Sequence, residues 1–400
     1  MNKIELLAPA GDLQRLKTAI LYGADAVFIG GKSFSLRSRA SNFDLPEIKK
    51  AVDFAHDHQA KVYVTVNMIM HQEDLDGLDE YLQALESCGV DAIICSSLFI
   101  ASRAYEVAKG LEVHISTQNS IANSYAADLY KDFHATRVVL AREATLQQID
   151  LLNQATDLEV EVFGHGGMCT NFSGHCTLSN YMTTRDANRG GCAQSCRWQY
   201  HLYDHGHEIS DKDYLFSMGS KDLSAMPVLD LLIETGVASL KIEGRMKTEY
   251  YIATVIGAYR RAIDDLYAGK DPQQVIERGV KELNNAANRE TSTGFLQRIP
   301  DAGGQLYLTQ AETVTQSYIG RVISQESSTL LATIELRNAI EVNDALESFG
   351  PKRDPQSFVV KHMLDKNGDV VQRSFRPMEH IQIQLNHLVS PGDFIRREAV

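Results

Sequence analysis

Four of the six cysteines in this chain of 400 residues fall within one short segment. Cys169, Cys176, Cys192 and Cys196 have the spacing Cys-x6-Cys-x15-Cys-x3-Cys. Clustered cysteines in a reducing compartment more often bind a metal or do redox chemistry than form structural disulfides. Structural zinc sites usually bring their ligands in close Cys-x2-Cys pairs, which this spacing lacks. The spacing therefore favours an iron–sulfur cluster, with zinc and unligated redox thiols as the alternatives.

The residues around the four cysteines fit a cluster better than a hydrolase. Glycines are abundant there, and small residues let backbone amides approach cluster sulfides. His165 and His175 are candidates to replace one thiolate ligand. A single activated nucleophile does not need four cysteines, and the chain contains neither GxSxG nor HExxH. The other two cysteines, Cys88 and Cys95, are flanked by apolar residues and are predicted to be buried, inert thiols.

Charge and hydropathy limit the class of protein. The net charge of −13 argues against a nonspecific nucleic-acid binder, which would normally be basic. From residue 315 onward, however, 10 Lys and Arg nearly balance 11 Asp and Glu, so this part has no strong charge barrier against RNA. No run approaches the length of an apolar membrane span, and the N-terminus does not resemble a signal peptide. We therefore expect a cytoplasmic protein without a membrane partner.

The elements that must position the cysteines alternate between strands and helices over residues 1–290. Short buried strands that alternate with amphipathic helices indicate a parallel α/β sheet. Eight such pairs in this length predict a (β/α)8 TIM-like barrel. A doubly wound open sheet is the competitor, but PAGDL follows the first strand where GxGxxG would be expected. The predicted strands span residues 4–9, 26–31, 61–67, 91–97, 111–117, 136–141, 158–166 and 238–244.

A barrel of this kind places its active site at the C-terminal ends of the strands. Of the polar residues there, Arg142 and Arg245 are candidates to contact an anionic ligand. The loop after the seventh strand, residues 166–220, is abnormally long and contains all four clustered cysteines. A helix is predicted after it, over residues 221–236. The substrate-binding residues predicted from the strand ends are Asn67, Gln118, Arg142, His165, Glu243 and Arg245.

The pattern of the sequence changes after the barrel, from alternating strands and helices to short strands. A linker is predicted over residues 291–314, and residues 315–400 give short β-type runs separated by turn signals such as SFGPKRDP and DKNGD. This pattern predicts a small appended β-barrel domain. Such domains often bind oligonucleotides and also serve as structural caps, so RNA contact is one expectation for it.

Several segments resemble peptidase family U32, whose "U" denotes an unknown catalytic type. The segment EVFGHGGMCTNFSGHCTLS resembles the signature of that family. STQNSIAN, VVLAREATLQQI, GGCAQSCRW and KIEGRMKTEYY resemble its tRNA-hydroxylation branch, and the resemblance extends over nearly the whole chain. The cysteine segment and KIEGRMKTEYY are the most specific of these matches.

The resemblance implies a cofactor, a reaction and partners. Hydroxylases of this superfamily carry a [4Fe-4S] cluster on four cysteines, which match Cys169, Cys176, Cys192 and Cys196 here. The tRNA-hydroxylation branch is associated with 5-hydroxyuridine at the wobble position of tRNA, with prephenate as co-substrate. Sister branches hydroxylate ribosomal RNA or a ubiquinone precursor. The family name keeps a peptidase, often described as a collagenase-like protease, as the alternative.

Residues near the cysteines fit these expectations. Arginine forks at Arg142 and Arg245 would suit the two carboxylates of prephenate. The candidates to stack on a base are Tyr181, Trp198 and Tyr250, with simple packing as their alternative role. The candidates to meet RNA phosphates are Arg185, Arg189 and Arg197, with solvation of a surface loop as their alternative role.

Overall fold

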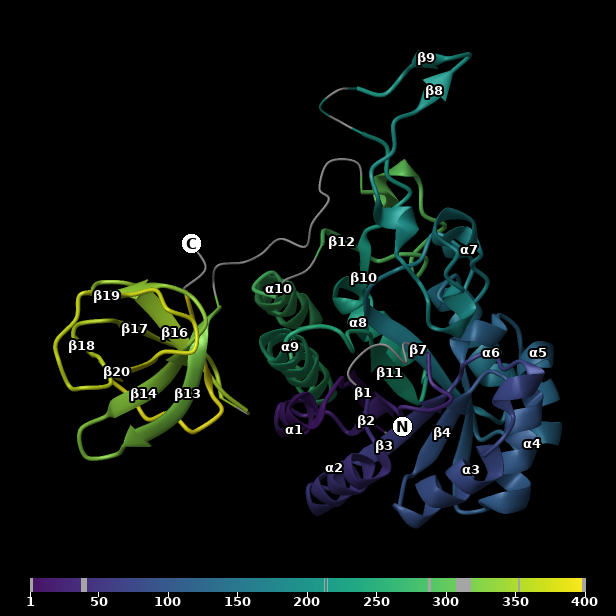
Figure 1. The fold of residues 1–400 in the computed structure, drawn as a ribbon, viewed down its shortest axis with the longest axis horizontal. Coiled ribbons are helices and arrows are strands. Elements are labelled where there is room, and N and C mark those ends of the chain that lie inside the picture. Colours follow the sequence, from purple (N-terminus) through teal and green to yellow (C-terminus); the bar gives the residue numbers. More distant parts are fainter. Residues whose placement is uncertain are drawn as a thin grey trace.

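The computed structural model describes residues 3–36, 42–211, 213, 215–286, 289–306, 318–351 and 353–397. Eight parallel strands form a closed barrel, because the last of them, β11, pairs with both the first, β1, and the seventh, β7 (Figure 1). All eight predicted strands are present, and the TIM-like barrel is confirmed. The barrel strands are β1 (Glu5–Pro9), β2 (Ala26–Gly30), β3 (Lys61–Val66), β4 (Ala92–Cys95), β5 (Glu112–Ile115), β6 (Arg137–Val139), β7 (Glu159–Gly166) and β11 (Ser239–Ile242).

Helices surround the barrel, and several of them begin with a side-chain cap. The Asp44 side chain accepts from the backbone N–H of Glu47, whose own side chain returns a bond to the Asp44 N–H. Thr145 and Gln148 form the same capping box. These bonds satisfy backbone donors that the first helical turn leaves without partners. The helices are α1 (Leu13–Leu21), α2 (Leu45–Asp57), α3 (Leu78–Ser87), α4 (Leu98–Val107), α5 (Ser124–Asp128), α6 (Leu146–Ala155), α8 (Leu229–Glu234), α9 (Glu249–Tyr267) and α10 (Pro272–Leu283).

Charged side chains fill part of the barrel interior. Arg137 contacts Glu5 at 2.6 Å and Glu161 at 3.2 Å, and Lys241 contacts Glu161 at 2.8 Å. Burial alone would raise the pKa of Glu161, yet Lys241 and Arg137 hold this pKa below its ordinary value. The network joins β1, β6, β7 and β11 across the barrel. Removing one partner would leave a buried charge uncompensated.

The chain after the cysteine loop differs from the prediction of one helix over residues 221–236. Residues Asp222–Ser224 form strand β10, which pairs antiparallel with the end of β7, and only Leu229–Glu234 form an α-helix. Strand β12 (Thr291–Ser292) pairs in turn with β10. Tertiary pairing therefore overrides the local helical pattern, because β10 satisfies the exposed backbone groups of the long strand β7.

The C-terminal region is an antiparallel β domain with its own core. Seven strands form one sheet in the order β17-β16-β21-β13-β14-β20-β18, which curves into a half-barrel (Figure 1). The predicted β-rich tail is thereby confirmed. Its strands are β13 (Tyr318–Glu326), β14 (Leu331–Leu336), β15 (Ile340–Glu341), β16 (Ala345–Phe349), β17 (Gln356–Val359), β18 (Met363–Leu364), β19 (Arg373–Ser374), β20 (His380–Gln384) and β21 (Phe394–Arg397).

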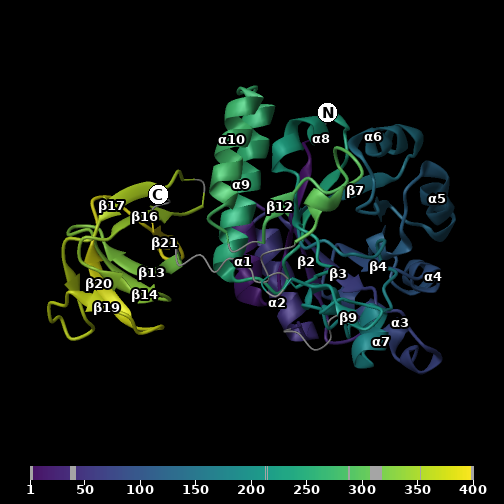
Figure 2. The ribbon, with the colours of Figure 1, turned by 90° about the horizontal axis from the view of Figure 1, so that it is seen from above.

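The β domain packs on helices α1, α9 and α10 of the barrel (Figure 2). Tyr250 of α9 stacks on Tyr318 of β13 with ring centroids 4.6 Å apart. Tyr22, directly after α1, meets Phe349 edge-on and Phe394 at a tilt, with ring centroids about 6 Å apart. Because these rings come from both regions, the two hydrophobic cores share one aromatic interface.

Candidate functional site at the barrel mouth

The cysteine loop, residues 166–220, extends from the end of β7 and covers part of the barrel mouth. It contains helix α7 (Leu178–Thr183) and a hairpin of β8 (Tyr203–Asp204) and β9 (His207–Glu208), which projects away from the barrel (Figure 1). Two bonds tie its parts together. Asn188 donates to the Cys176 carbonyl at 3.1 Å, and the Ala193 N–H donates to the Ser179 hydroxyl at 3.0 Å.

All four cysteines of the loop are free thiols. Cys169 and Cys192 are exposed residues, whereas Cys176 and Cys196 are half-buried. Although Cys169 is exposed as a residue, desolvation by surrounding protein atoms raises the pKa of its thiol, which Arg142 and Arg197 partly offset. Negative charge on Cys196 and Cys192 raises this pKa further. Three of the four thiols therefore interact electrostatically, and two arginines lie beside them.

The segment between Cys169 and Cys176 is docked on the barrel by Ser173. The Glu143 carboxylate, just beyond β6, accepts from the Ser173 N–H at 2.9 Å and from its hydroxyl at 2.7 Å. The Ser173 hydroxyl in turn accepts from the Arg142 N–H at 3.1 Å. Glu143 thus holds the middle of the segment that carries the first two cysteines.

Gly174 lets the same segment lie directly on the backbone after β5. Its φ is +83°, and an added Cβ would stand 2.4 Å from the Cα of Gln118. A side chain there would therefore meet both backbone strain and a clash with backbone. The position requires glycine.

We predict that Gly174→Ala loosens the cysteine loop. Gly206, at the tip of the β8–β9 hairpin, has the same φ of +83° but nothing within 4 Å of an added Cβ. Gly206→Ala should cost about 1 kcal/mol, from backbone strain alone. Gly174→Ala should cost about 1–3 kcal/mol more, because the loop must move off Gln118. Denaturant unfolding and the rate of proteolysis within the loop measure the difference; equal effects of the two variants would contradict the docking.

The far side of the loop is held by Arg189. Its guanidinium contacts the Asp74 carboxylate at 2.5 and 3.1 Å and donates to the Ile69 carbonyl at 2.9 Å. The Ile69 N–H also donates to the Asn188 carbonyl at 3.3 Å. Arg189 therefore joins the loop to the chain after β3. The predicted phosphate contact at Arg189 competes with this ion pair.

The Asp74 contact should persist at every ordinary pH. The bonds from Arg189 and from the His71 N–H lower the pKa of Asp74 from 3.8 to about 2. Since the folded-state pKa is lowered, the contact contributes fully above pH 3.8 and is lost as the pH falls through about 2. Asp74→Asn should therefore raise the rate of loop proteolysis equally at pH 5 and pH 8. Proteolysis that increases only at one of these pH values would contradict the assignment.

Arg142 lies next to the first cysteine of the loop. Its guanidinium stacks 3.8 Å from the centroid of the Phe163 ring and donates to the Gly167 carbonyl. Arg197 approaches the same turn and donates to the Met168 carbonyl at 3.2 Å. Two cations thus flank the backbone immediately before Cys169.

Arg245 is more deeply placed in the mouth. It is buried, and it donates to the Asn42 side chain at 2.5 Å and approaches the Thr65 hydroxyl at 3.5 Å. An added Cβ at Gly30 would stand 2.3 Å from the Arg245 guanidinium, so that glycine makes room for the arginine. Arg245 therefore closes the mouth over β2 and β3.

Asn67 and Gln118 meet each other in the mouth. The Asn67 side chain donates to the Gln118 side chain at 2.8 Å, and Gln118 donates back to the Asn67 carbonyl at 3.1 Å. Both are half-buried and face the ends of β3 and β5. The structure brings these two predicted residues together, and the backbone of Gln118 lies against Gly174 of the cysteine loop.

His165 and Glu243 lie at the β7–β11 seam. A bulge in this pairing turns His165 toward α9, where Tyr259 is 3.4 Å from its Nδ1 atom. His165 is buried in that interface. The Glu243 N–H donates to the His165 carbonyl at 2.8 Å, and Glu243 is half-buried. Sequence alternation alone would have pointed His165 into the barrel, and the bulge reverses this direction.

The three aromatic residues predicted to stack on a base separate into two groups. Tyr181 and Trp198 are 86% and 43% exposed on the cysteine loop. Tyr250 is 2% exposed, and its hydroxyl donates to the Asn285 carbonyl within the interface with the β domain. A base can therefore reach Tyr181 or Trp198 but not Tyr250. Arg185 is exposed.

Residues that sequence analysis missed hold the site in place. Glu143 belongs to the polar residues that follow the predicted strands, while Ser173, Asp74 and Asn42 carry no signal in the sequence. Their partners lie 30 to 203 residues away in the chain. No local pattern reveals such contacts. Of the two isolated cysteines, Cys95 is buried as predicted, and burial raises the pKa of its thiol to about 12. The prediction that Cys88 is buried is wrong, because Cys88 is half-buried.

The four thiols of the loop supply the donor type that a metal group held by cysteines needs. In the part of the chain that the structure describes, no three His, Cys, Asp or Glu side chains are gathered closely enough to hold a single ion. Thiolates bind both zinc and the irons of a cluster, so the donor chemistry fits a metal group held by thiolates.

Comparison with known proteins assigns the family. The model of peptidase family U32 matches residues 11–305, and that of its C-terminal domain matches residues 314–396. The chain belongs to peptidase family U32. The first match therefore covers the barrel with its cysteine loop, and the second covers the β domain.

Relatives within family U32 carry different names. The chain is 40% identical to tRNA hydroxylation protein P1 of Bacillus subtilis, over 99% of this chain and 95% of that protein. It is 41% identical to a 23S rRNA 5-hydroxycytidine synthase of Escherichia coli, over 74% of this chain and 43% of that protein. It is 30% identical to a collagenase of Porphyromonas gingivalis, over 88% of this chain and 87% of that protein. The described residues include no helix long and apolar enough to cross a bilayer.

Proposed function

We propose that this chain hydroxylates a pyrimidine in RNA, with tRNA as its substrate and 5-hydroxyuridine at the wobble position as its product. The observation that carries the proposal is the coincidence of four free thiols at the mouth of a barrel with 40% identity to a tRNA hydroxylation protein over nearly the full length. The ribosomal RNA relative, named for 5-hydroxycytidine, supports the same reaction class.

We assign a [4Fe-4S] cluster to Cys169, Cys176, Cys192 and Cys196. The four free thiols on one loop and the charge interaction of Cys169 with Cys192 and Cys196 support it. A bound cluster would supply electron transfer at the barrel mouth. Glu143 and Arg189 hold the loop in place, while Arg142 and Arg197 lower the cost of thiolate charge beside Cys169.

The residues of the mouth are assigned to the two reactants. Arg142 is half-buried beside Cys169 and suits a carboxylate of prephenate, the proposed co-substrate. Arg245 is a second carboxylate contact for a ligand that enters along the barrel axis. The wobble base is already in a single-stranded loop, so little unstacking energy opposes its approach to Asn67 and Gln118.

Nucleoside mass spectrometry tests the proposal. The gene is expressed in a bacterium from which the endogenous tRNA hydroxylation genes have been deleted, and the tRNA nucleosides are analysed. Restoration of 5-hydroxyuridine derivatives is expected, and it should depend on a prephenate supply. Unchanged tRNA together with new 5-hydroxycytidine in ribosomal RNA would mean that the substrate is ribosomal RNA and not tRNA. Unchanged RNA together with hydrolysis of gelatin by the purified chain would favour a peptidase, as the collagenase relative suggests.

A further inference from the structure

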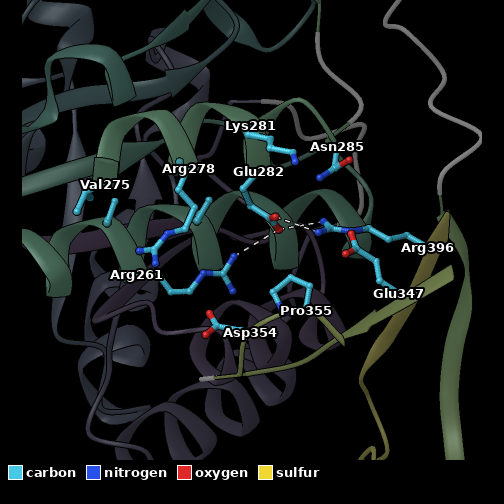
Figure 3. Close-up of a pocket in the computed structure, with 13 residues that line it drawn as sticks. Arg261, Val275, Arg278, Lys281, Glu282, Asn285, Glu347, Asp354, Pro355 and Arg396 are labelled. Carbon is cyan, nitrogen blue, oxygen red and sulfur yellow. Dashed lines mark hydrogen bonds and ion pairs between the residues drawn. The ribbon is translucent and has the colours of Figure 1, made fainter. Parts of the chain in front are cut away.

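A cleft of about 230 Å³ opens between helices α9 and α10 and the β domain, away from the cysteine loop (Figure 3). Small apolar residues, Ala258, Ala262 and Val275, form part of its lining. The remaining lining is mostly charged, with four cationic side chains against three carboxylates. The charged residues are Arg261, Arg278, Lys281, Arg396, Glu282, Glu347 and Asp354.

Two of the three carboxylates are already neutralised within the protein. Both terminal nitrogens of Arg396 contact Glu282 at 2.9 Å, and its Nε donates to Glu347. The side chain of Arg396 is only 1% exposed, so this trio forms a closed wall of the cleft. It leaves neither carboxylate to repel an incoming anion strongly.

The other cations face the opening. Arg278 and Lys281 are one turn apart on α10 and both are exposed at the rim. Arg278 pairs with Asp265, but Lys270 also contacts that carboxylate at 2.7 Å, so two cations share one anion. Within the described residues, Lys281 has no ion-pair partner. Arg261 reaches Glu282 at 3.4 Å. The rim therefore carries positive charge on a chain whose net charge is −13.

One end of the cleft lies on the mouth side of the barrel. Helix α9 begins shortly after β11, on that side. The end of α10 returns to the same side, because the Tyr250 hydroxyl in the first turn of α9 contacts the Asn285 carbonyl at 3.1 Å. Asn285 also lines the cleft, so this end of the cleft and the barrel mouth face the same side of the molecule.

We propose that this cleft binds a phosphate group of the backbone of the RNA substrate, with Arg278 and Lys281 as the principal contacts. The inference rests on the proposed function, because it takes RNA as the substrate. Guanidinium and ammonium groups are suited to phosphate oxygens. The cleft is smaller than the 300–1,000 Å³ of typical small-molecule pockets, which suits one phosphate with its sugar. Such a contact fixes the orientation of the RNA and does not read its sequence.

The test measures the affinity of the full chain for bulk tRNA across a range of salt concentrations. The cleft variant combines Arg278→Gln with Lys281→Gln. The matched control combines Lys50→Gln with Lys109→Gln, two exposed lysines that do not line the cleft. Thermal unfolding verifies that both variants are folded. At about 0.1 M salt, the cleft variant should bind tRNA about tenfold more weakly, and its salt slope should fall by about two. The control should match the wild type.

Each outcome bears on one of the two proposals. Wild-type affinity and slope in the cleft variant would overturn the cleft site and leave the hydroxylase proposal intact. If the cleft variant binds RNA more weakly but the wild type produces no hydroxylated nucleoside, the proposed hydroxylase function is wrong and the proposed RNA site in the cleft stands. Inorganic phosphate provides a second arm. If the cleft variant weakens binding of inorganic phosphate but not of tRNA, the site serves a free anion and the RNA assignment is wrong.

Discussion

Cys169→Ala should abolish RNA hydroxylation and remove the brown colour that we expect of anaerobically purified protein. The pKa of the Cys169 thiol responds to Arg142 and Arg197 and to both Cys192 and Cys196. The loss of one of four thiolates should leave the cluster with an incomplete ligand set. The measurements are iron per chain, expected to fall from about four, visible absorbance, and 5-hydroxyuridine in tRNA.

The matched control is Cys88→Ala. Cys88 is also a free cysteine; it is half-buried and lies at the end of α3, outside the cysteine loop. This variant should keep the iron, the colour and the activity of the wild type. A Cys169→Ala protein that retained a full complement of iron would refute the ligand assignment. A colourless wild-type preparation that contained zinc would refute the cluster itself.

Arg396→Met should weaken the attachment of the β domain by about 3–5 kcal/mol. The Arg396 guanidinium contacts Glu282 of α10 with two nitrogens at 2.9 Å and stacks 4.6 Å from the centroid of the Phe349 ring. Methionine would leave Glu282, whose side chain is only 11% exposed, without its main cation. The expected result is an early unfolding transition of the β domain in urea, before the barrel unfolds.

The pH dependence of this contact provides a check. Burial alone would raise the pKa of Glu282, but the bonds from Arg396 and Arg261 hold that pKa below its ordinary value of 4.5. A lowered carboxylate pKa contributes stability above pH 4.5, which is lost as the pH falls through the folded-state pKa. In Arg396→Met this acid-dependent contribution should shrink. The control Arg373→Met removes an arginine that is 60% exposed, and it should change neither the transition nor its pH dependence.

The barrel could be predicted from the sequence because the patterns that mark its strands and helices are local. Each strand is a short apolar run, and several of the helices that follow begin with a side-chain cap, as at Asp44 and Thr145. These patterns need no knowledge of distant residues. The prediction failed over residues 221–236, where pairing with β7 converts part of a helical pattern into β10. Strand pairing depends on what lies alongside, which a local pattern does not encode.

By itself, the sequence determined the closed barrel, the separate β domain and the family, because hydrophobic periodicity and the cysteine motif are patterns of residues that lie close together in the sequence. It also identified the four thiols as one group, although their spacing left iron–sulfur, zinc and redox roles open. Only the tertiary structure decided which neighbours hold them: Glu143, Asp74 and the backbone of Gln118 are brought to the loop by the ends of other strands. It also moved His165 and Tyr250 out of the reach of substrate, since a bulge and a domain interface, not residue type, set where a side chain points.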